Sequence, residues 1–194
     1  GQPFWSDYEF CASVRSLKSE FGLLFAVRSP EDYWLLRWSL HSLGQRATPM
    51  ELVHIQNNTP TVVAAAKALG RADSWYRLGV KLNGNRITAL LDGVVVLSHI
   101  EPGCTGGGIG LYTKGALETT FDDVDVQHVP GLTPDDADLA LGQGQTMRPL
   151  QGHWEASQTQ GETVISARRE GIRASKPAIL ALGWQDWPAQ CLQV

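Results

Sequence analysis

The sequence predicts an all-β chain built around an antiparallel β-sandwich. Short runs rich in aromatic and β-branched residues alternate with a period of two through the first 130 residues, and turn residues separate them. Helical periodicity is nearly absent from the same stretch. The glycine-rich run GGIGLYTKGALETTFDDVDV, residues 107–126, is expected to be the closing strand of the domain. Many short strands divided by turn signals are typical of sandwiches.

Alternation gives the first expected strands a buried face. In the first strand one face carries only apolar side chains, those of Tyr8, Phe10, Ala12 and Val14. Two further strands are expected over residues 21–29 and 33–39, joined by the turn Pro30-Glu31-Asp32. Another hairpin is expected from residues 50–56 and 60–68, because Asn57-Asn58 between them tolerates the left-handed conformation of a tight turn.

A three-stranded meander and the closing strand complete the expected sandwich. Residues 76–82, 87–91 and 94–100 form the meander, with turns at Asn83-Gly84-Asn85 and Asp92-Gly93. In the closing strand Val124 and Val126 share one face, and Phe121 is out of phase with them. This phase change predicts a β-bulge near Asp122 and Asp123.

The remaining residues suggest an internal duplication. Residues 131–149 are rich in proline, glycine and acidic residues and are interpreted as a linker, and residues 150–194 contain further short strands. Trp184-Gln185-Asp186-Trp187 repeats the pattern of Trp5-Ser6-Asp7-Tyr8. Residues 1–130 would then be a sandwich that lacks its first strands, and residues 150–194 part of a second repeat. These strands could complete the sandwich in their own molecule or, by swapping, in a neighbouring copy.

Composition and charge narrow the classes of function. The net charge is −4, from 16 basic and 20 acidic residues, with no block of Lys and Arg that could follow a phosphate backbone, so a nucleic-acid partner is not expected. The longest apolar runs are far shorter than a membrane-spanning helix. Cys11, Cys104 and Cys191 form no C-x-x-C pair. They are interpreted as buried thiols, or as one disulfide pair in an oxidising compartment.

Four blocks of the first 130 residues resemble the concanavalin A-like, laminin G-like jelly-roll superfamily, and within it the bacterial modules described as 3-keto-disaccharide hydrolase-like. In chain order they are WSDYEF from Trp5, GLLF with DYWLLR from Gly22 and Asp32, SWYRL with DG from Ser74 and Asp92, and GIGLY with FDDV from Gly108 and Phe121. The resemblance implies a concanavalin A-like jelly roll. It does not choose a function, because such folds serve as carbohydrate-binding modules, adhesion domains and glycosidases.

A sugar-binding site needs an aromatic platform and polar groups for hydroxyls, and the sequence offers Tyr33, Arg37 and His54. Alternation places Tyr33 and Arg37 on the surface, and Trp34 and Trp38 in the core. Two other tryptophans, Trp5 and Trp75, are expected to pack within the sandwich, since large aromatic residues at strand entries usually do.

The acidic pair Asp122 and Asp123 suits a structural Ca²⁺, which related jelly rolls often hold near their terminal strands. The alternative is that one carboxylate bonds backbone at the bulge and the other is solvated.

Catalytic patterns are absent from the linear sequence. The jelly-roll glucanases carry Glu-x-Asp-x-x-Glu, which does not occur here, and Glu51, Glu101 and Glu118 are interpreted as solvated surface acids. The glycine run 106–110 precedes an expected strand and therefore offers no helix N-terminus to a phosphate.

These observations favour a non-catalytic, carbohydrate-binding module of an extracytoplasmic protein, periplasmic or secreted. Two alternatives stay open. The chain could be a glycoside hydrolase of the 3-keto-disaccharide hydrolase type, whose acids meet only in three dimensions. It could instead be a structural or assembly domain that pairs with a neighbouring copy.

Overall fold

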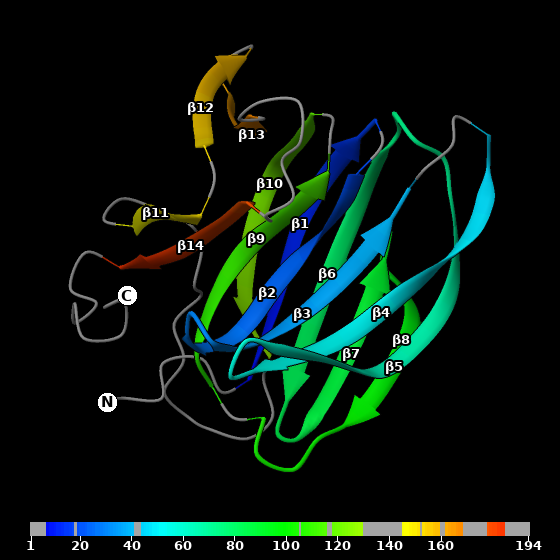
Figure 1. Cartoon of the computed structure of the whole chain (residues 1–194), viewed down its shortest axis with the longest axis vertical. Coiled ribbons are helices and arrows are strands. Elements are labelled where there is room, and N and C mark those ends of the chain that lie inside the picture. The colour runs from blue at the N-terminus through cyan, green and yellow to red at the C-terminus, as the bar shows by residue number, and fades with distance from the viewer. Residues whose placement is uncertain are drawn as a thin grey trace.

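Two antiparallel β-sheets packed face to face make up the computed structural model (Figure 1). It describes residues 7–17, 19–40, 44–104, 106–115, 118–129, 145–151, 153–159, 162–168 and 178–184. Every regular element among them is a β-strand, so the predicted antiparallel β-sandwich is confirmed. None of the described segments forms a helix of the length and apolarity that crossing a bilayer requires.

The first sheet has the strand order β12-β13-β10-β1-β6-β7-β8. Its strands are β1 (Tyr8–Ser16), β6 (Trp75–Asn83), β7 (Arg86–Leu91), β8 (Val94–Ile100), β10 (Thr119–His128), β12 (His153–Thr159) and β13 (Glu162–Arg168).

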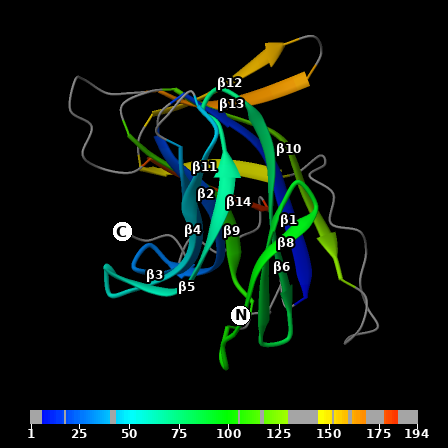
Figure 2. The ribbon, with the colours of Figure 1, turned by 90° about the vertical axis from the view of Figure 1, so that its right-hand side faces the viewer.

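The second sheet has the order β11-β14-β9-β2-β3-β4-β5. Its strands are β2 (Ser19–Ser29), β3 (Asp32–Ser39), β4 (Arg46–Gln56), β5 (Thr59–Gly70), β9 (Gly108–Gly115), β11 (Gln145–Gln151) and β14 (Ala178–Trp184). Seen from the side, β3, β4 and β5 lie in one layer, and β1, β6 and β8 lie in the other (Figure 2).

The core lies between the sheets and follows the predicted alternation. The four residues expected on the buried face of β1, from Tyr8 to Val14, are all fully buried. Trp34 and Trp38 are also core residues, as predicted. The Trp38 indole packs edge-on against Phe21 and donates a hydrogen bond from Nε1 to Thr48 Oγ1 at 2.8 Å. The largest core side chain therefore keeps its one polar group satisfied.

Tight turns form where the sequence predicts them. Asn57 and Asn58 have φ values of 49° and 61°, and Asp92 and Gly93 have φ values of 51° and 78°. Asn, Asp and Gly adopt this left-handed region at the lowest cost. The hairpins β4–β5 and β7–β8 are therefore closed by the residues that the sequence singles out.

The expected single closing strand over residues 107–126 is wrong, because the structure divides it into β9 and β10, which lie in different sheets. Gly115, with φ of 146°, ends β9, and a β-carbon there would lie 3.1 Å from Ser19. The bulge prediction is confirmed. Cys11 pairs with Asp125 and Ser13 pairs with Asp122, so β10 has one more residue than β1 between these two pairs. Asp123, within the extra length, has φ of 46°.

Trp75 does not pack within the sandwich, contrary to the prediction. It is 47% exposed, whereas its neighbour Tyr76 packs against the core. Strand alternation explains the difference, because Tyr76 pairs with the buried Val14 and Trp75 pairs with Arg15 on the outer face. Trp5 lies outside the described residues.

The C-terminal strands extend both sheets in their own chain. β14 pairs with β9 through Ala178 to Leu182, and β13 pairs with β10 at Thr119, Thr120 and Phe121. β11 begins at Gln145, inside the stretch interpreted as linker. Residues 131–144, Cys191 and the repeat residues 185–187 lie outside the described residues, so the duplication and the swapping alternative stay predictions.

Candidate functional site

The structure places only two of the three residues predicted to bind a ligand on the same face of a sheet. Tyr33 and Arg37 lie on the outer face of the second sheet, between core residues of β3. His54 pairs in register with Trp34 and therefore lies on the inner face. The grouping of His54 with the other two is wrong, because the register between β3 and β4 places it on the opposite side of the sheet.

Arg37 lies at the centre of a charged cluster on that outer face. Its Nε donates to Glu51 Oε2 at 2.7 Å, and its Nη1 lies 3.8 Å from Glu20 Oε2. Tyr112 donates its hydroxyl hydrogen to Glu20 Oε1 at 2.6 Å. The charged side chains are 27%, 25% and 22% exposed for Arg37, Glu51 and Glu20, so solvent still reaches them. We call these four residues the Arg37 cluster.

Four adjacent strands position the Arg37 cluster. Glu51 on β4 lies directly opposite Arg37 on β3, and on the other side Gly22 of β2 pairs with both Arg37 and Tyr112 of β9. A β-carbon at Gly22 would lie 2.0 Å from the Leu36 carbonyl oxygen. Glycine is therefore required at this position, where β2 lies against β3 next to Arg37.

An apolar cluster lies on the same outer face. It consists of Leu24, Leu35, Val53, Ile55 and Tyr112, with Val27 and Tyr33 partly buried against it. Tyr33 is held in this cluster, and burial raises its pKa. Tyr112 belongs to both groups and so links the apolar cluster to the charged one.

The electrostatics of the Arg37 cluster keep every donor protonated. Burial alone would lower the pKa of Arg37, but the hydrogen bond with Glu51 and the charges of Glu20 and Glu51 outweigh it and raise the pKa. Burial, reinforced by the hydrogen bond to Glu20, raises the pKa of Tyr112. Both carboxylates accept hydrogen bonds from these donors. The cluster thus presents acceptors and donors side by side, which suits the hydroxyl groups of a polar ligand.

A glycosidase needs one carboxyl group that can donate a proton to the leaving oxygen. In the Arg37 cluster each carboxylate already accepts a hydrogen bond. Glu51 accepts from Arg37, and Glu20 accepts from Tyr112. Both acids of the Arg37 cluster are therefore engaged by neighbouring donors.

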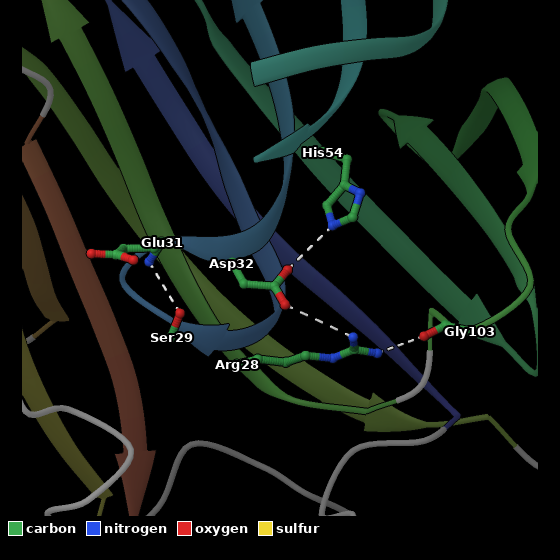
Figure 3. Close-up of polar contacts among 6 residues, drawn as sticks. All are labelled: Arg28, Ser29, Glu31, Asp32, His54 and Gly103. Atoms are coloured by element: carbon green, nitrogen blue, oxygen red, sulfur yellow. Dashed lines mark hydrogen bonds and ion pairs between the residues drawn. The ribbon is translucent and has the colours of Figure 1, made fainter. Parts of the chain in front are cut away.

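His54 belongs to a second polar cluster, at the β2–β3 hairpin (Figure 3). Its Nε2 lies 3.2 Å from Asp32 Oδ1, and its ring stacks on Trp34 with centroids 4.3 Å apart and planes 7° from parallel. Figure 3 shows Asp32 between His54 and Arg28, whose Nη1 is 3.9 Å from Asp32 Oδ2. Arg28 also donates to the Gly103 carbonyl oxygen, which ties the β8–β9 loop to this hairpin.

An orienting carboxylate next to a histidine is one part of a nucleophilic catalytic group. The contacts that the structure gives His54 within the described ranges are with Asp32 and Trp34, and neither supplies a hydroxyl or thiol for a His-activated nucleophile. The nearby Ser29 hydroxyl instead accepts from the Glu31 amide at 3.2 Å. Among the described residues, these contacts connect β4 and the β8–β9 loop to the β2–β3 hairpin.

The two aspartates predicted to bind calcium are engaged by protein donors. Asp122 Oδ1 accepts from the Asp123 amide at 2.8 Å, and Asp123 Oδ2 accepts from the Ser13 hydroxyl at 3.0 Å. Arg77 donates to the Asp123 carbonyl oxygen at 3.2 Å, where its positive charge would oppose a cation. No set of three or more His, Cys, Asp or Glu suited to a metal occurs among the residues that the structure describes. The arrangement does not fit Ca²⁺, which takes six to eight oxygen ligands.

Millimolar Ca²⁺ is therefore expected to leave the melting temperature of the protein unchanged, because a cation that does not bind the folded state cannot stabilise it. Differential scanning fluorimetry with and without EDTA measures this. A rise in melting temperature that is lost in Asp122→Asn and Asp123→Asn, but kept in the control Glu31→Gln, would contradict this expectation and support the calcium site.

The two described cysteines are free thiols. Cys104 is buried in the core, where burial raises the pKa of its thiol to about 12. Cys11 lies on the outer face of β1, where burial and the charge of Glu9 raise the pKa of its thiol to about 11. Both thiols are thus protonated at neutral pH and unsuited to nucleophilic or redox chemistry.

Three members of the Arg37 cluster were not found from the sequence. Glu51 was expected to be a solvated surface acid; its side chain keeps 25% of its exposure, but it is bonded to Arg37. Glu101, which is not a member of the cluster, was also expected to be solvated; its Oε2 lies 3.3 Å from His99 Nε2. Glu20 and Tyr112 gave no signal, since they are remote in sequence and meet only through the pairing of β2 with β9.

Comparisons with known proteins agree with the fold. No family model matches the sequence, and no curated protein sequence matches it. Among solved structures, the chain is similar to the carbohydrate binding module CBM66 from Bacillus subtilis, with 18% identity and a TM-score of 0.53 over 62% of this chain and 74% of the module. At that identity the likeness shows the fold alone.

A second similar structure is a 1,3-alpha-1,4-beta-D-galactose-4-sulfate-3,6-anhydro-D-galactose 4 galactohydrolase, with 9% identity and a TM-score of 0.31 over 92% of this chain and 64% of the enzyme.

Proposed function

We propose that the chain is a non-catalytic carbohydrate-binding module, and that it binds sugar at the Arg37 cluster. The observation that carries the proposal is the partly exposed guanidinium of Arg37 between two carboxylates. Carboxylates accept from sugar hydroxyls, and the guanidinium donates to them. A cluster with both kinds of group can bind neighbouring hydroxyls of one ring in charge-assisted hydrogen bonds.

Tyr33 extends the proposed site along β3. It lies four residues from Arg37 on the same face, so the two α-carbons are about 13 Å apart at about 3.3 Å per residue. One sugar ring does not span this distance, whereas a short chain of rings does. We therefore expect an oligosaccharide, with one ring on the Tyr33 side chain and another at the charged cluster.

The fold supports this proposal, since a similar solved structure is named as a carbohydrate binding module. The hydrolase alternative is weaker, because both carboxylates of the Arg37 cluster act as acceptors. A module that binds polysaccharide would meet it outside the cytoplasm, so the proposal includes an extracytoplasmic location.

A glycan array tests the proposed function. The wild-type chain should bind a restricted set of oligosaccharides, and Tyr33→Ala should lose this binding because the aromatic platform is removed. The control Val62→Ala changes an exposed residue on the edge strand β5 and should bind as the wild type does. A flat response of the wild-type chain across all glycans would refute the proposal.

A further inference from the structure

The outer face of the first sheet carries an exposed tryptophan that the proposed function does not use. Trp75 is 47% exposed, and every other aromatic residue whose burial the structure describes is buried or half-buried. Tryptophan is on average a highly buried residue. Its indole presents a broad apolar face to solvent at little cost in conformational entropy.

The surroundings of Trp75 are polar and charged. Arg15 lies directly opposite Trp75 in the β1–β6 register. Its Nε and Nη2 both contact Asp73 Oδ1, at 2.7 Å and 2.6 Å. Among the described residues the second carboxylate oxygen, Asp73 Oδ2, accepts no hydrogen bond. An aromatic face, a guanidinium and a carboxylate oxygen are thus presented together.

These groups are fixed before any ligand arrives. The Asp73 amide donates to the Ser16 carbonyl oxygen at 2.8 Å, and the Arg71 amide donates to the Tyr76 hydroxyl at 2.8 Å. Asp73 is held at φ of 64°, a conformation that aspartate tolerates better than most residues. A preorganised loop reduces the entropy that a ligand would have to offset on binding.

A second polar pair continues the surface along β6. Arg77 lies two residues from Trp75 on the same face, about 7 Å along the strand. It donates to the Asp123 carbonyl oxygen, and the bulge presents the exposed Asp123 side chain beside Ser13. The bulge at the predicted acidic pair therefore adds a polar group to this face. Arg77 Nη2 also lies 3.9 Å from Asp125 Oδ2, so acidic side chains outnumber the arginines here, which disfavours an anionic polymer as the ligand.

We propose that Trp75, Arg15 and Asp73 form a second carbohydrate-binding surface, on the sheet opposite the Arg37 cluster. The indole would stack on the apolar face of a sugar ring, while Asp73 and Arg15 bind its hydroxyls and Arg77 borders the next ring. The class of ligand rests on the proposed function, but the surface is independent of the Arg37 cluster.

Affinity gel electrophoresis of the full chain in mixed-linkage glucan, xylan and galactomannan tests this surface. Trp75→Ala should bind about tenfold more weakly to whichever polysaccharide retains the wild type, which corresponds to about 1.4 kcal/mol. Trp75→Phe should keep most of the affinity, because a smaller aromatic platform remains. The control Ile100→Ala removes an equally exposed residue, 53%, at the far end of the same sheet, and should change nothing.

A double variant separates the two sites. If both exist, Trp75→Ala combined with Arg37→Met binds more weakly than either single variant. Loss in Arg37→Met alone, with Trp75→Ala binding as the wild type does, overturns the second surface and keeps the proposed function. Loss of binding in Trp75→Ala alone, with Arg37→Met binding as the wild type does, supports the second surface and overturns the proposed site at the Arg37 cluster.

Two further outcomes overturn the second surface. One is a wild-type dimer in light scattering that Trp75→Ala dissociates without any change in retention, because the tryptophan would then serve a protein contact. The other is no retention of the wild type by any of the polysaccharides.

Discussion

Replacing Arg37 with methionine is expected to weaken binding of the best glycan by at least about tenfold, because one charge-assisted hydrogen bond is worth about 1.5 kcal/mol or more. It should also lower the free energy of unfolding by about 2 kcal/mol, because Glu51 and Glu20 lose their positive partner. The side chains are about a quarter exposed, which keeps this cost below that of a fully buried pair. Calorimetric titration and urea denaturation measure the two quantities.

Two variants control the Arg37 experiment. Arg86→Met removes an exposed arginine of the other sheet, whose Nη1 bonds only the Ser98 hydroxyl at 3.3 Å among the described contacts, and should affect neither quantity. Arg37→Lys keeps the charge but not the planar fork, so it should recover stability more than affinity. Undiminished affinity in Arg37→Met would show that the sugar binds elsewhere.

Replacing Gly22 with alanine is expected to destabilise the protein by about 3 kcal/mol, near the upper end of what overpacking costs. The added β-carbon would lie 2.0 Å from the Leu36 carbonyl oxygen and 3.0 Å from the Arg37 α-carbon. These are backbone atoms, so β2 and β3 must move apart. For a chain of this length the melting temperature should fall by about 10 °C.

Gly79→Ala is the matched control, a strand glycine of the first sheet. Its β-carbon would meet Cys11 Sγ at 2.9 Å and Leu90 Cδ1 at 3.2 Å, which are side-chain atoms that can shift. A cost of about 1 kcal/mol is expected there. Equal melting temperatures for Gly22→Ala and the wild type would mean that the strands of the Arg37 cluster are not packed as described.

The fold was largely predictable because its signals are local. Alternation identified the buried face of β1, and Asn57-Asn58 and Asp92-Gly93 marked turns that the structure places in the left-handed region. The division of residues 107–126 was missed because the β9–β10 connection lacks such a pair. Gly115 marks the end of β9, but the same type of residue occurs several times earlier in that run.

The site was less predictable, because its members meet through register. The expected strands 33–39 and 50–56 would, if paired symmetrically, place Arg37 opposite Leu52, one residue from its observed partner Glu51. A slip of one residue moves every side chain of a strand to the other face. The same one-residue shift in register pairs His54 with Trp34 on the inner face, and pairs Tyr33 with Ile55 on the outer face.

The exposure of Trp75 was missed for a related reason. Its position at the start of β6 suggested a packing role, but only the pairing of Tyr76 with Val14 decides which of two adjacent aromatic residues turns inward. Sequence patterns thus identified which residues form strands, and cross-strand register decided which side chains could act together.

The central claim, that sugar binds at the Arg37 cluster, is tested most directly by NMR titration of the full chain with its best oligosaccharide from the array. Arginine side-chain Nε–H signals can be assigned with Arg37→Lys. The Arg37 signal should shift in a saturable manner, together with the backbone amides of Glu20, Glu51 and Tyr112, while the Arg86 signal stays unchanged. Saturable binding that leaves the Arg37 signal and these amides unchanged would contradict the claim.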